Sequence, residues 1–226
     1  MFKLKKKDNV FLLNLGVGIN LKKYQEISID VTKKKKEIGV NDDSIILLSV
    51  GELNENKNHL FVIEKLEKEG IFNAYPTLKY IICGEGRLRA KYENYIKEHS
   101  LEGKVVLLGF RYDINEILKI SKIFIFPSIR EGLPSSIIEA MASGLPIICS
   151  DIRGNRDLVE TNKNGFLFKL TSDAEFSTYL NSLLENELEY KRISENNKEK
   201  SKNYDCVNAR SKILRLFNDI GLGDGI

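Results

Sequence analysis

Two glutamates, Glu131 and Glu139, flank the predicted start of a helix. Glu139 is the only charged residue in segment 132–150, so its carboxylate sits among small and apolar residues and needs polar partners such as ligand hydroxyls. Residues 132–134 (Gly-Leu-Pro) lead into the helix, whose free N–H groups and positive dipole end suit a phosphate. The pattern predicts a ligand with a sugar, a diphosphate and a ribose in a row. The competing interpretation is a glutamate that points out through a gap or caps a neighbouring backbone.

The elements that must position these carboxylates are short apolar strands alternating with helical patterns. Such alternation predicts parallel βαβ units and therefore an α/β fold with a doubly wound parallel sheet, Rossmann-like, followed by a helical C-terminal tail. The first five apolar runs are nearly continuous, which indicates strands covered by helices on both faces. We expect strands at 44–50, 78–84, 104–110, 122–128, 145–150 and 165–168, helices near 57–69, 86–99, 113–121, 134–143 and 154–160, and two or three helices within 173–219.

Ligands of open parallel sheets bind outside the carboxyl ends of the strands. The segments that follow the predicted strands are rich in glycine and polar residues, and glycine lets backbone N–H groups approach an anion closely. These segments are 51–58, 84–89, 109–113, 127–136 and 150–155.

Composition excludes several classes of protein. The chain has 226 residues, 42% of them apolar and 30% charged, an ordinary balance for a globular protein of one or two domains. No run of about 18 apolar residues occurs, which argues against a membrane-spanning helix. The start of the chain resembles a signal peptide in its charge, but Asn14 and two glycines interrupt its apolar stretch and no cleavage site follows. We therefore expect a cytoplasmic protein.

Cysteine, histidine and acidic residues give no sign of a metal site. The three cysteines, Cys83, Cys149 and Cys206, are scattered, no pair has zinc-ligand spacing, and the chain has only two histidines. Cys83 and Cys149 end apolar runs and are expected to lie in the core. We expect no metal.

Positive charge is concentrated near the start of the chain. Residues 1–40 carry ten lysines and four acidic residues, whereas the whole chain has a net charge of only +3. Such a segment could contact anionic lipid head groups or an acidic partner. The alternative is a solvated, lysine-rich helix end at Lys33–Lys36. Because basic and aromatic residues do not gather elsewhere, no nucleic-acid partner is expected.

The stretch EGLPSSIIEAMASGLPIICSD (131–151) resembles the E-x7-E segment of retaining glycosyltransferases with the GT-B fold, specifically the family-four (glycosyl transferases group 1) type. The resemblance covers about residues 14–170 and is nearest to enzymes of bacterial surface-polysaccharide biosynthesis. Further motifs match the carboxyl-terminal, donor-binding domain of that family in the expected order: LGVGINLKKY (15–24), SVGELNENKNH (49–59), CGEGRLR (83–89), LLGFRYDI (107–114), IFIFPSIREG (123–132) and GNRDLVETNKNGFLF (154–168).

The resemblance implies a site for a nucleotide-sugar donor, with UDP-sugars favoured and no cofactor. It implies that Glu131 contacts hydroxyls of the transferred hexosyl unit, that Glu139 holds the ribose, and that Lys57 neutralises charge on the departing diphosphate. Lys57 and Glu131 are therefore the candidate catalytic residues. The candidate donor-binding residues are Gly51, Gly84, Arg87, Phe110, Arg111, Gly132, Leu133, Pro134 and Glu139; Phe110 and Arg111 lie where the base is recognised and Gly132, Leu133 and Pro134 where backbone groups meet the sugar and diphosphate.

Two departures from the family pattern qualify this expectation. Many members have arginine after the first-strand glycine, whereas this chain has Glu52, so positive charge at the diphosphate falls unless Arg87 supplements it. The resemblance also begins near Met1. We therefore expect residues 1–20 to be a basic leader or linker remnant, residues 21–226 to be the nucleotide-sugar-binding domain, and the acceptor domain to be absent. A separate acceptor-domain subunit, or self-association with a second copy of the chain, would then complete the nucleotide-sugar-binding domain. The domain could also contact the inner face of a membrane peripherally.

Two alternatives remain open. The chain could be a non-catalytic nucleotide-sugar-binding partner, or pseudoenzyme subunit, of a glycosyltransferase. It could also be a nicotinamide-binding Rossmann domain, but that motif needs G-x-G-x-x-G after the first strand. Here the first strand is followed by GELNEN, and segment 83–88 lacks the third glycine.

Overall fold

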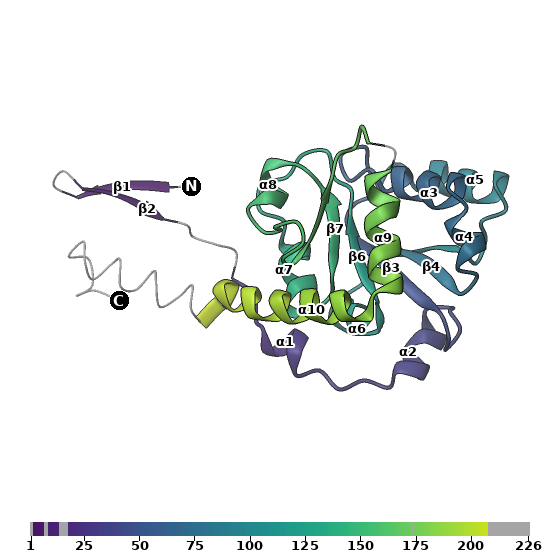
Figure 1. Cartoon of the computed structure of the whole chain (residues 1–226), viewed down its shortest axis with the longest axis horizontal. Helices are drawn as coiled ribbons and strands as arrows, with labels where there is room; N and C mark the ends of the chain where they lie inside the picture. The colour runs from purple at the N-terminus through teal and green to yellow at the C-terminus, as the bar shows by residue number, and fades with distance from the viewer. Residues whose placement is uncertain (1, 7–8, 14–17, 173, 208–226) are drawn as a thin grey trace.

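A six-stranded parallel sheet forms the centre of the computed structural model, which describes residues 2–6, 9–13, 18–172 and 174–207 (Figure 1). Its strands are β3 (Ile45–Val50), β4 (Leu78–Cys83), β5 (Val105–Gly109), β6 (Ile123–Phe126), β7 (Ile147–Ser150) and β8 (Gly165–Phe168). Their spatial order is β5-β4-β3-β6-β7-β8. The chain winds outward from β3 to β5 and then returns to β6, so the topological switch point lies between β3 and β6. The predicted doubly wound sheet is confirmed.

Both faces of the sheet are buried, which explains why its strands are almost wholly apolar. Side chains alternate between two hydrophobic clusters: Leu48 and Phe124 belong to one, Leu47 and Ile123 to the other. Helices α6 (Ile114–Ile120) and α7 (Ser135–Ala142) pack on the first face, and α3 (His59–Lys68), α5 (Arg89–Glu98) and α9 (Glu175–Glu185) on the second. Cys83 and Cys149 are buried in the first cluster, as expected.

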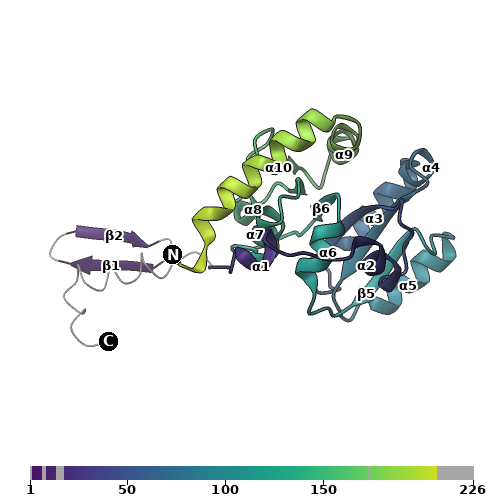
Figure 2. The same cartoon turned by 90° about the horizontal axis from the view of Figure 1, so that it is seen from below.

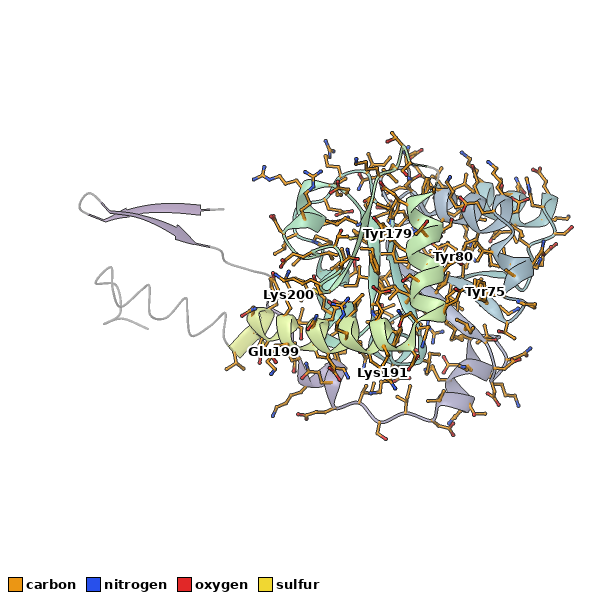
Figure 3. The ribbon with its side chains drawn as sticks, in the orientation of Figure 1. Tyr75, Tyr80, Tyr179, Lys191, Glu199 and Lys200 are labelled. Atoms are coloured by element: carbon orange, nitrogen blue, oxygen red, sulfur yellow. The ribbon has the colours of Figure 1, made fainter. Side chains whose placement is uncertain are left out.

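Helix α10 (Glu187–Ser201) ties the C-terminal part of the described chain to α7 and α9 (Figure 2). Its buried Asn197 donates a hydrogen bond to the carbonyl of Leu145 at 2.7 Å and accepts one from Asn164 at 3.0 Å. Its charged residues Lys191 and Glu199, labelled in Figure 3, are exposed. The two helices expected first in the tail are thus α9 and α10, and the rest of the predicted tail, 208–219, lies outside the described residues.

Predicted and observed elements differ mainly at the start of the chain and in short helices. The antiparallel pair β1 (Phe2–Lys6) and β2 (Asn9–Leu13) was not expected. Helices α1 (Lys22–Gln25), α2 (Val31–Glu37) and α4 (Ile71–Ala74) were also not delimited from sequence, and α8 (Arg153–Arg156) is shorter than the predicted 154–160. No helix of the described residues is long and apolar enough to cross a membrane.

The lysines of α2 are only partly solvated: Lys33 and Lys36 are exposed, so the alternative of a solvated lysine run is found in part. Lys34 is mostly buried and forms ion pairs with Glu37, Asp113 and Glu116. Lys35 donates hydrogen bonds to backbone carbonyls just before β3. Half of the lysine run therefore attaches α2 to the body of the domain.

Candidate functional site

The candidate site lies at the switch point, where the loop after β3 (51–58) meets the loop after β6 (127–134). Backbone and side-chain hydrogen bonds join the two loops directly: the amide of Ile129 donates to the carbonyl of Asn56 at 2.8 Å, and Asn58 donates to the carbonyl of Pro127 at 3.5 Å. In a doubly wound sheet this is the position at which ligands bind.

Lys57 and Glu131, the two predicted catalytic residues, are brought together here. Lys57 Nζ lies 2.7 Å from Glu131 Oε1, and the two side chains are 22% and 14% exposed. The amine also lies 5.0 Å from the ring centroid of Phe126, at the end of β6. The Lys57 stem crosses Gly51 so closely that a Cβ on Gly51 would lie 3.2 Å from Lys57 Cδ. Glycine at position 51 therefore leaves room for the Lys57 side chain to reach the second loop.

Close backbone packing explains the glycines of the neighbouring loop. A Cβ on Gly84 would lie 1.9 Å from the carbonyl oxygen of Gly51, and a Cβ on Gly86 would lie 2.4 Å from that of Leu53. Both are far below van der Waals contact, so only glycine allows the loops after β3 and β4 to touch. Gly84 supports the site by packing behind Gly51.

The second glutamate, Glu139, lies in the middle of α7 and is half-buried. Tyr24, a buried residue of α1, lies close enough for its hydroxyl to interact with this carboxylate. Burial raises the pKa of Glu139, and the interaction with Tyr24 and the charge of Lys23 oppose that shift. Burial, and then the Glu139 charge, raise the pKa of Tyr24 above its usual range. The carboxylate predicted to hold the ribose thus has a polar partner in the protein, contributed by a short helix that the sequence patterns did not single out.

Between the two glutamates, α7 begins without a side-chain cap from any described residue, so its first N–H groups are not satisfied by a side chain. Pro134 precedes the helix in an extended conformation. Apart from the residues next to Gly132 in the chain, no atom of the described residues lies within 4 Å of the place a Cβ would occupy on Gly132. By contrast, a Cβ on Gly154, in α8, would lie 2.1 Å from the Gly132 carbonyl oxygen. The 132–134 turn is therefore backed by α8 on one side and open on the other. That arrangement can receive an anion such as a diphosphate.

The two predicted arginines form ion pairs with other parts of the protein. Arg87 pairs with Glu55 of the β3 loop. Arg111 lies 2.5 Å from Asp113 and 2.5 Å from Glu37 of α2. The Arg111 guanidinium therefore holds the pKa of Asp113 well below its usual range. Neither arginine is brought next to Lys57 or Glu131 by these contacts, and their roles in donor binding stay predictions.

Aromatic side chains are exposed at the end of β5, where base recognition is expected. Phe110 is 65% exposed and Tyr112 is 89% exposed, and their rings pack edge to face with centroids 4.9 Å apart. Because exposed aromatic rings offer flat surfaces to other rings, this pair can stack against a nucleobase. Tyr112 was not predicted from sequence, although its position two residues from Phe110 was a usable signal.

His59 lies behind the β3 loop and is completely buried at the start of α3. Neither of its ring nitrogens makes a hydrogen bond within the described part of the chain. Burial lowers the pKa of His59 to about 4, the charge of Lys57 acts in the same direction, and the nearby backbone of Gly51 and Glu52 opposes the shift. The ring is thus a neutral support for the loop that carries Lys57. Glu52, in the same loop, is exposed.

A family model and several curated proteins match this chain. Residues 30–200 match the model of the family described as "Glycosyl transferases group 1". Over 211 residues the chain is 34% identical to the UDP-Gal:alpha-D-GlcNAc-diphosphoundecaprenol alpha-1,3-galactosyltransferase of Escherichia coli, a match that covers 92% of this chain and 51% of that protein. The chain spans about half the length of the curated relatives it matches.

Solved structures share the fold. Anabaena Alr3699/HepE, solved in complex with UDP and glucose, superposes with a TM-score of 0.80 at 23% identity, covering 89% of this chain and 55% of that one. The C-terminal domain of the Francisella tularensis glycosyl transferase group 1 family protein LpcC gives a TM-score of 0.72 at 18% identity, covering 84% of this chain and 100% of that one. The fold is thus that of the carboxyl-terminal domain of GT-B enzymes. With the family model matching residues 30–200, the chain belongs to the glycosyl transferases group 1 family.

Proposed function

We propose that the chain is the donor-binding half of a retaining glycosyltransferase that takes a hexosyl unit from a nucleoside diphosphate sugar, with UDP-sugars preferred. The observation that carries the proposal is the Lys57–Glu131 ion pair at the switch point, next to the open turn that starts α7. In this pair, the Lys57 amine is a cation that can bind a diphosphate, and the Glu131 carboxylate can accept hydrogen bonds from sugar hydroxyls. Family membership supports glycosyl transfer and removes the support for a nicotinamide-binding domain.

Each residue has a distinct part in this proposal. The N–H groups at the start of α7 hold the diphosphate, the half-buried Glu139 accepts hydrogen bonds from the ribose, and Glu131 accepts them from the sugar. As the bond between the anomeric carbon and the phosphate oxygen breaks, its electron pair goes to the diphosphate. The Lys57 amine stabilises that developing charge as a fixed cation. The acceptor oxygen then bonds to the same face of the sugar, and its proton leaves with the diphosphate.

The base is expected to lie against the aromatic pair Phe110 and Tyr112, so that stacking supplies affinity and backbone groups supply selectivity. The Anabaena protein of the same fold was solved with UDP bound, which supports a uridine nucleotide. Calorimetric titration of the 226-residue chain with UDP, GDP and ADP tests this part. UDP should bind most tightly, and tighter binding of either purine diphosphate would overturn the uridine assignment.

The acceptor is proposed to be a glycan or a lipid-linked sugar, because the Escherichia coli relative is named for a diphosphoundecaprenol-linked acceptor. A second, acceptor-binding half, whether in the same polypeptide or another, would hold it against the anomeric carbon, and peripheral contact with a membrane would bring the two together. The 226-residue chain assayed alone with labelled UDP-sugar should bind donor without transferring sugar. Robust transfer by the isolated monomer would contradict the half-enzyme proposal.

A second candidate function is a nucleotide-sugar-binding partner that does not turn over. The exposed carboxylate of Glu52, where many family members have arginine, favours it because a negative charge opposes a departing diphosphate. Reconstitution with an acceptor-binding half from a relative separates the two candidates. Transfer that is lost in a Lys57→Met variant supports the enzyme, whereas donor binding without transfer in the reconstituted system supports the non-catalytic partner.

A further inference from the structure

Asn56 makes the densest set of contacts between the two loops of the site. Its side-chain NH2 donates to the carbonyl of Arg130 at 2.9 Å, and its side-chain oxygen accepts from the amide of Arg130 at 3.1 Å. Its backbone carbonyl accepts from the amide of Ile129 at 2.8 Å. Its side-chain nitrogen also lies 3.4 Å from Glu131 Oε1. One side chain thus pairs with both polar groups of the residue that precedes the candidate catalytic glutamate.

This pairing restricts Glu131 more than a single contact would. The side-chain amide of Asn56 binds both the N–H and the C=O of Arg130, so the backbone of Arg130 cannot rotate without breaking a hydrogen bond. Because Glu131 is the next residue, its position is restricted as well. Asn56 also precedes Lys57, so the same residue joins the segments that carry both members of the ion pair. Asn54 differs, because it accepts from the Lys57 amide at 2.9 Å within its own loop. Asn58 also reaches the second loop, but its single contact is a 3.5 Å hydrogen bond to the carbonyl of Pro127, four residues before Glu131.

We propose that Asn56 is a positioning residue that holds the Glu131 carboxylate in register with Lys57 and with the transferred sugar. The donor-binding readout of this inference rests on the proposed function. Because Asn56 acts on the glutamate assigned to the sugar, its loss should weaken binding of the intact nucleotide sugar more than binding of the nucleotide alone.

Calorimetry with UDP and UDP-glucose on the full 226-residue chain tests the proposal in Asn56→Ala and Asn56→Asp variants. The aspartate keeps the size of the side chain and the acceptor for the Arg130 amide. However, it cannot donate to the Arg130 carbonyl and places a second negative charge beside Glu131. Both variants should lose roughly tenfold in affinity for UDP-glucose, as expected for one or two lost hydrogen bonds, and less than about threefold for UDP. Full recovery by aspartate would show that Asn56 only fills space and would overturn the proposal.

Asn186→Ala is the matched control. This asparagine caps α10 by accepting from the Glu189 amide at 3.0 Å, and α10 packs on α7 and α9. Its removal should lower thermal stability without changing the ratio of UDP-glucose to UDP affinity. An equal change of that ratio in the control would overturn the assignment to Asn56.

An experiment without ligand separates failure of this inference from failure of the proposed function. In crystal structures of the wild-type and Asn56→Ala chains, the 2.7 Å contact between Lys57 and Glu131 should be present in the first and lost in the second. If the wild-type chain binds neither UDP nor UDP-glucose, the proposed function fails and this contact alone decides the role of Asn56. An unchanged contact in the variant would overturn the positioning role.

Discussion

Replacing His59 by leucine tests whether the loop that carries Lys57 rests on a neutral, buried histidine. Leucine has a similar size, is apolar and cannot take up a proton. The wild-type ring is completely buried, and its pKa is lowered to about 4 from an ordinary value of 6.5, chiefly by burial. The unfolded chain therefore binds a proton at His59 as the pH falls through 6.5, whereas the folded chain does not until the pH approaches 4.

The magnitude follows from proton linkage. A base whose pKa is depressed in the folded state contributes stability that is present above the unfolded pKa and lost as the pH falls toward the folded pKa. For a pKa of 6.5 unfolded and about 4 folded, the loss of unfolding free energy between pH 7.5 and pH 5 is about 2 kcal/mol. In a chain of this length that loss corresponds to roughly 4–8 °C in melting temperature.

The assay is urea unfolding of both chains at pH 7.5 and pH 5, followed by circular dichroism. Subtracting the change in unfolding free energy of one chain from that of the other removes the contribution of carboxyl groups, which titrate in this range in both chains. The wild-type chain should lose about 2 kcal/mol more than His59→Leu over this interval. Parallel profiles would refute the reasoning, as would a histidine NMR titration that places the His59 pKa near 6.5.

Charges in and beside the site give three further predictions. Lys57→Met should weaken UDP by roughly tenfold to a hundredfold, because the diphosphate loses a charge-assisted partner; calorimetry measures this, and unchanged affinity would contradict the role of Lys57. Glu139→Gln should unfold at a higher temperature than the wild type at pH 7, because burial raises the Glu139 pKa, and its advantage should vanish as the pH falls through that pKa toward 4.5. Asp113→Asn should cost about 1 kcal/mol at pH 7 by weakening the pairs with Arg111 and Lys34, as thermal melts would show. Because these pairs lower the folded-state pKa of Asp113 from its ordinary 3.8, the difference should begin to shrink only below that pH and part of it should remain at pH 3; a difference already gone at pH 4 would contradict the lowered pKa.

The sheet could be predicted because its strands are buried on both faces. All six predicted strands are found within a few residues of their expected bounds, since continuous apolar runs such as 45–48 and 123–126 occur where side chains face two cores. Short helices were not delimited because their boundaries are set by distant partners. Helix α2, for example, is attached by ion pairs from Lys34 to Asp113 and Glu116, which are remote in sequence.

The candidate site could be predicted where its residues belong to sequence motifs that follow the strands. Lys57 and Glu131 were expected at the same sheet edge, and the structure joins them directly. The contacts of Asn56 and Tyr24 could not be predicted, because each is made with a residue more than seventy positions away. The pairing of Arg111 with Glu37 was missed for the same reason.

The central claim is that one nucleotide sugar bridges Glu139 and Glu131, and calorimetry of Glu131→Gln and Glu139→Gln with UDP and UDP-glucose tests it most directly. Glu139→Gln should weaken both ligands by roughly tenfold, because both contain the ribose. Glu131→Gln should weaken UDP-glucose only, and its UDP affinity should stay the same or increase because Lys57 is released from its 2.7 Å ion pair. Equal losses for both ligands in both variants would contradict the account.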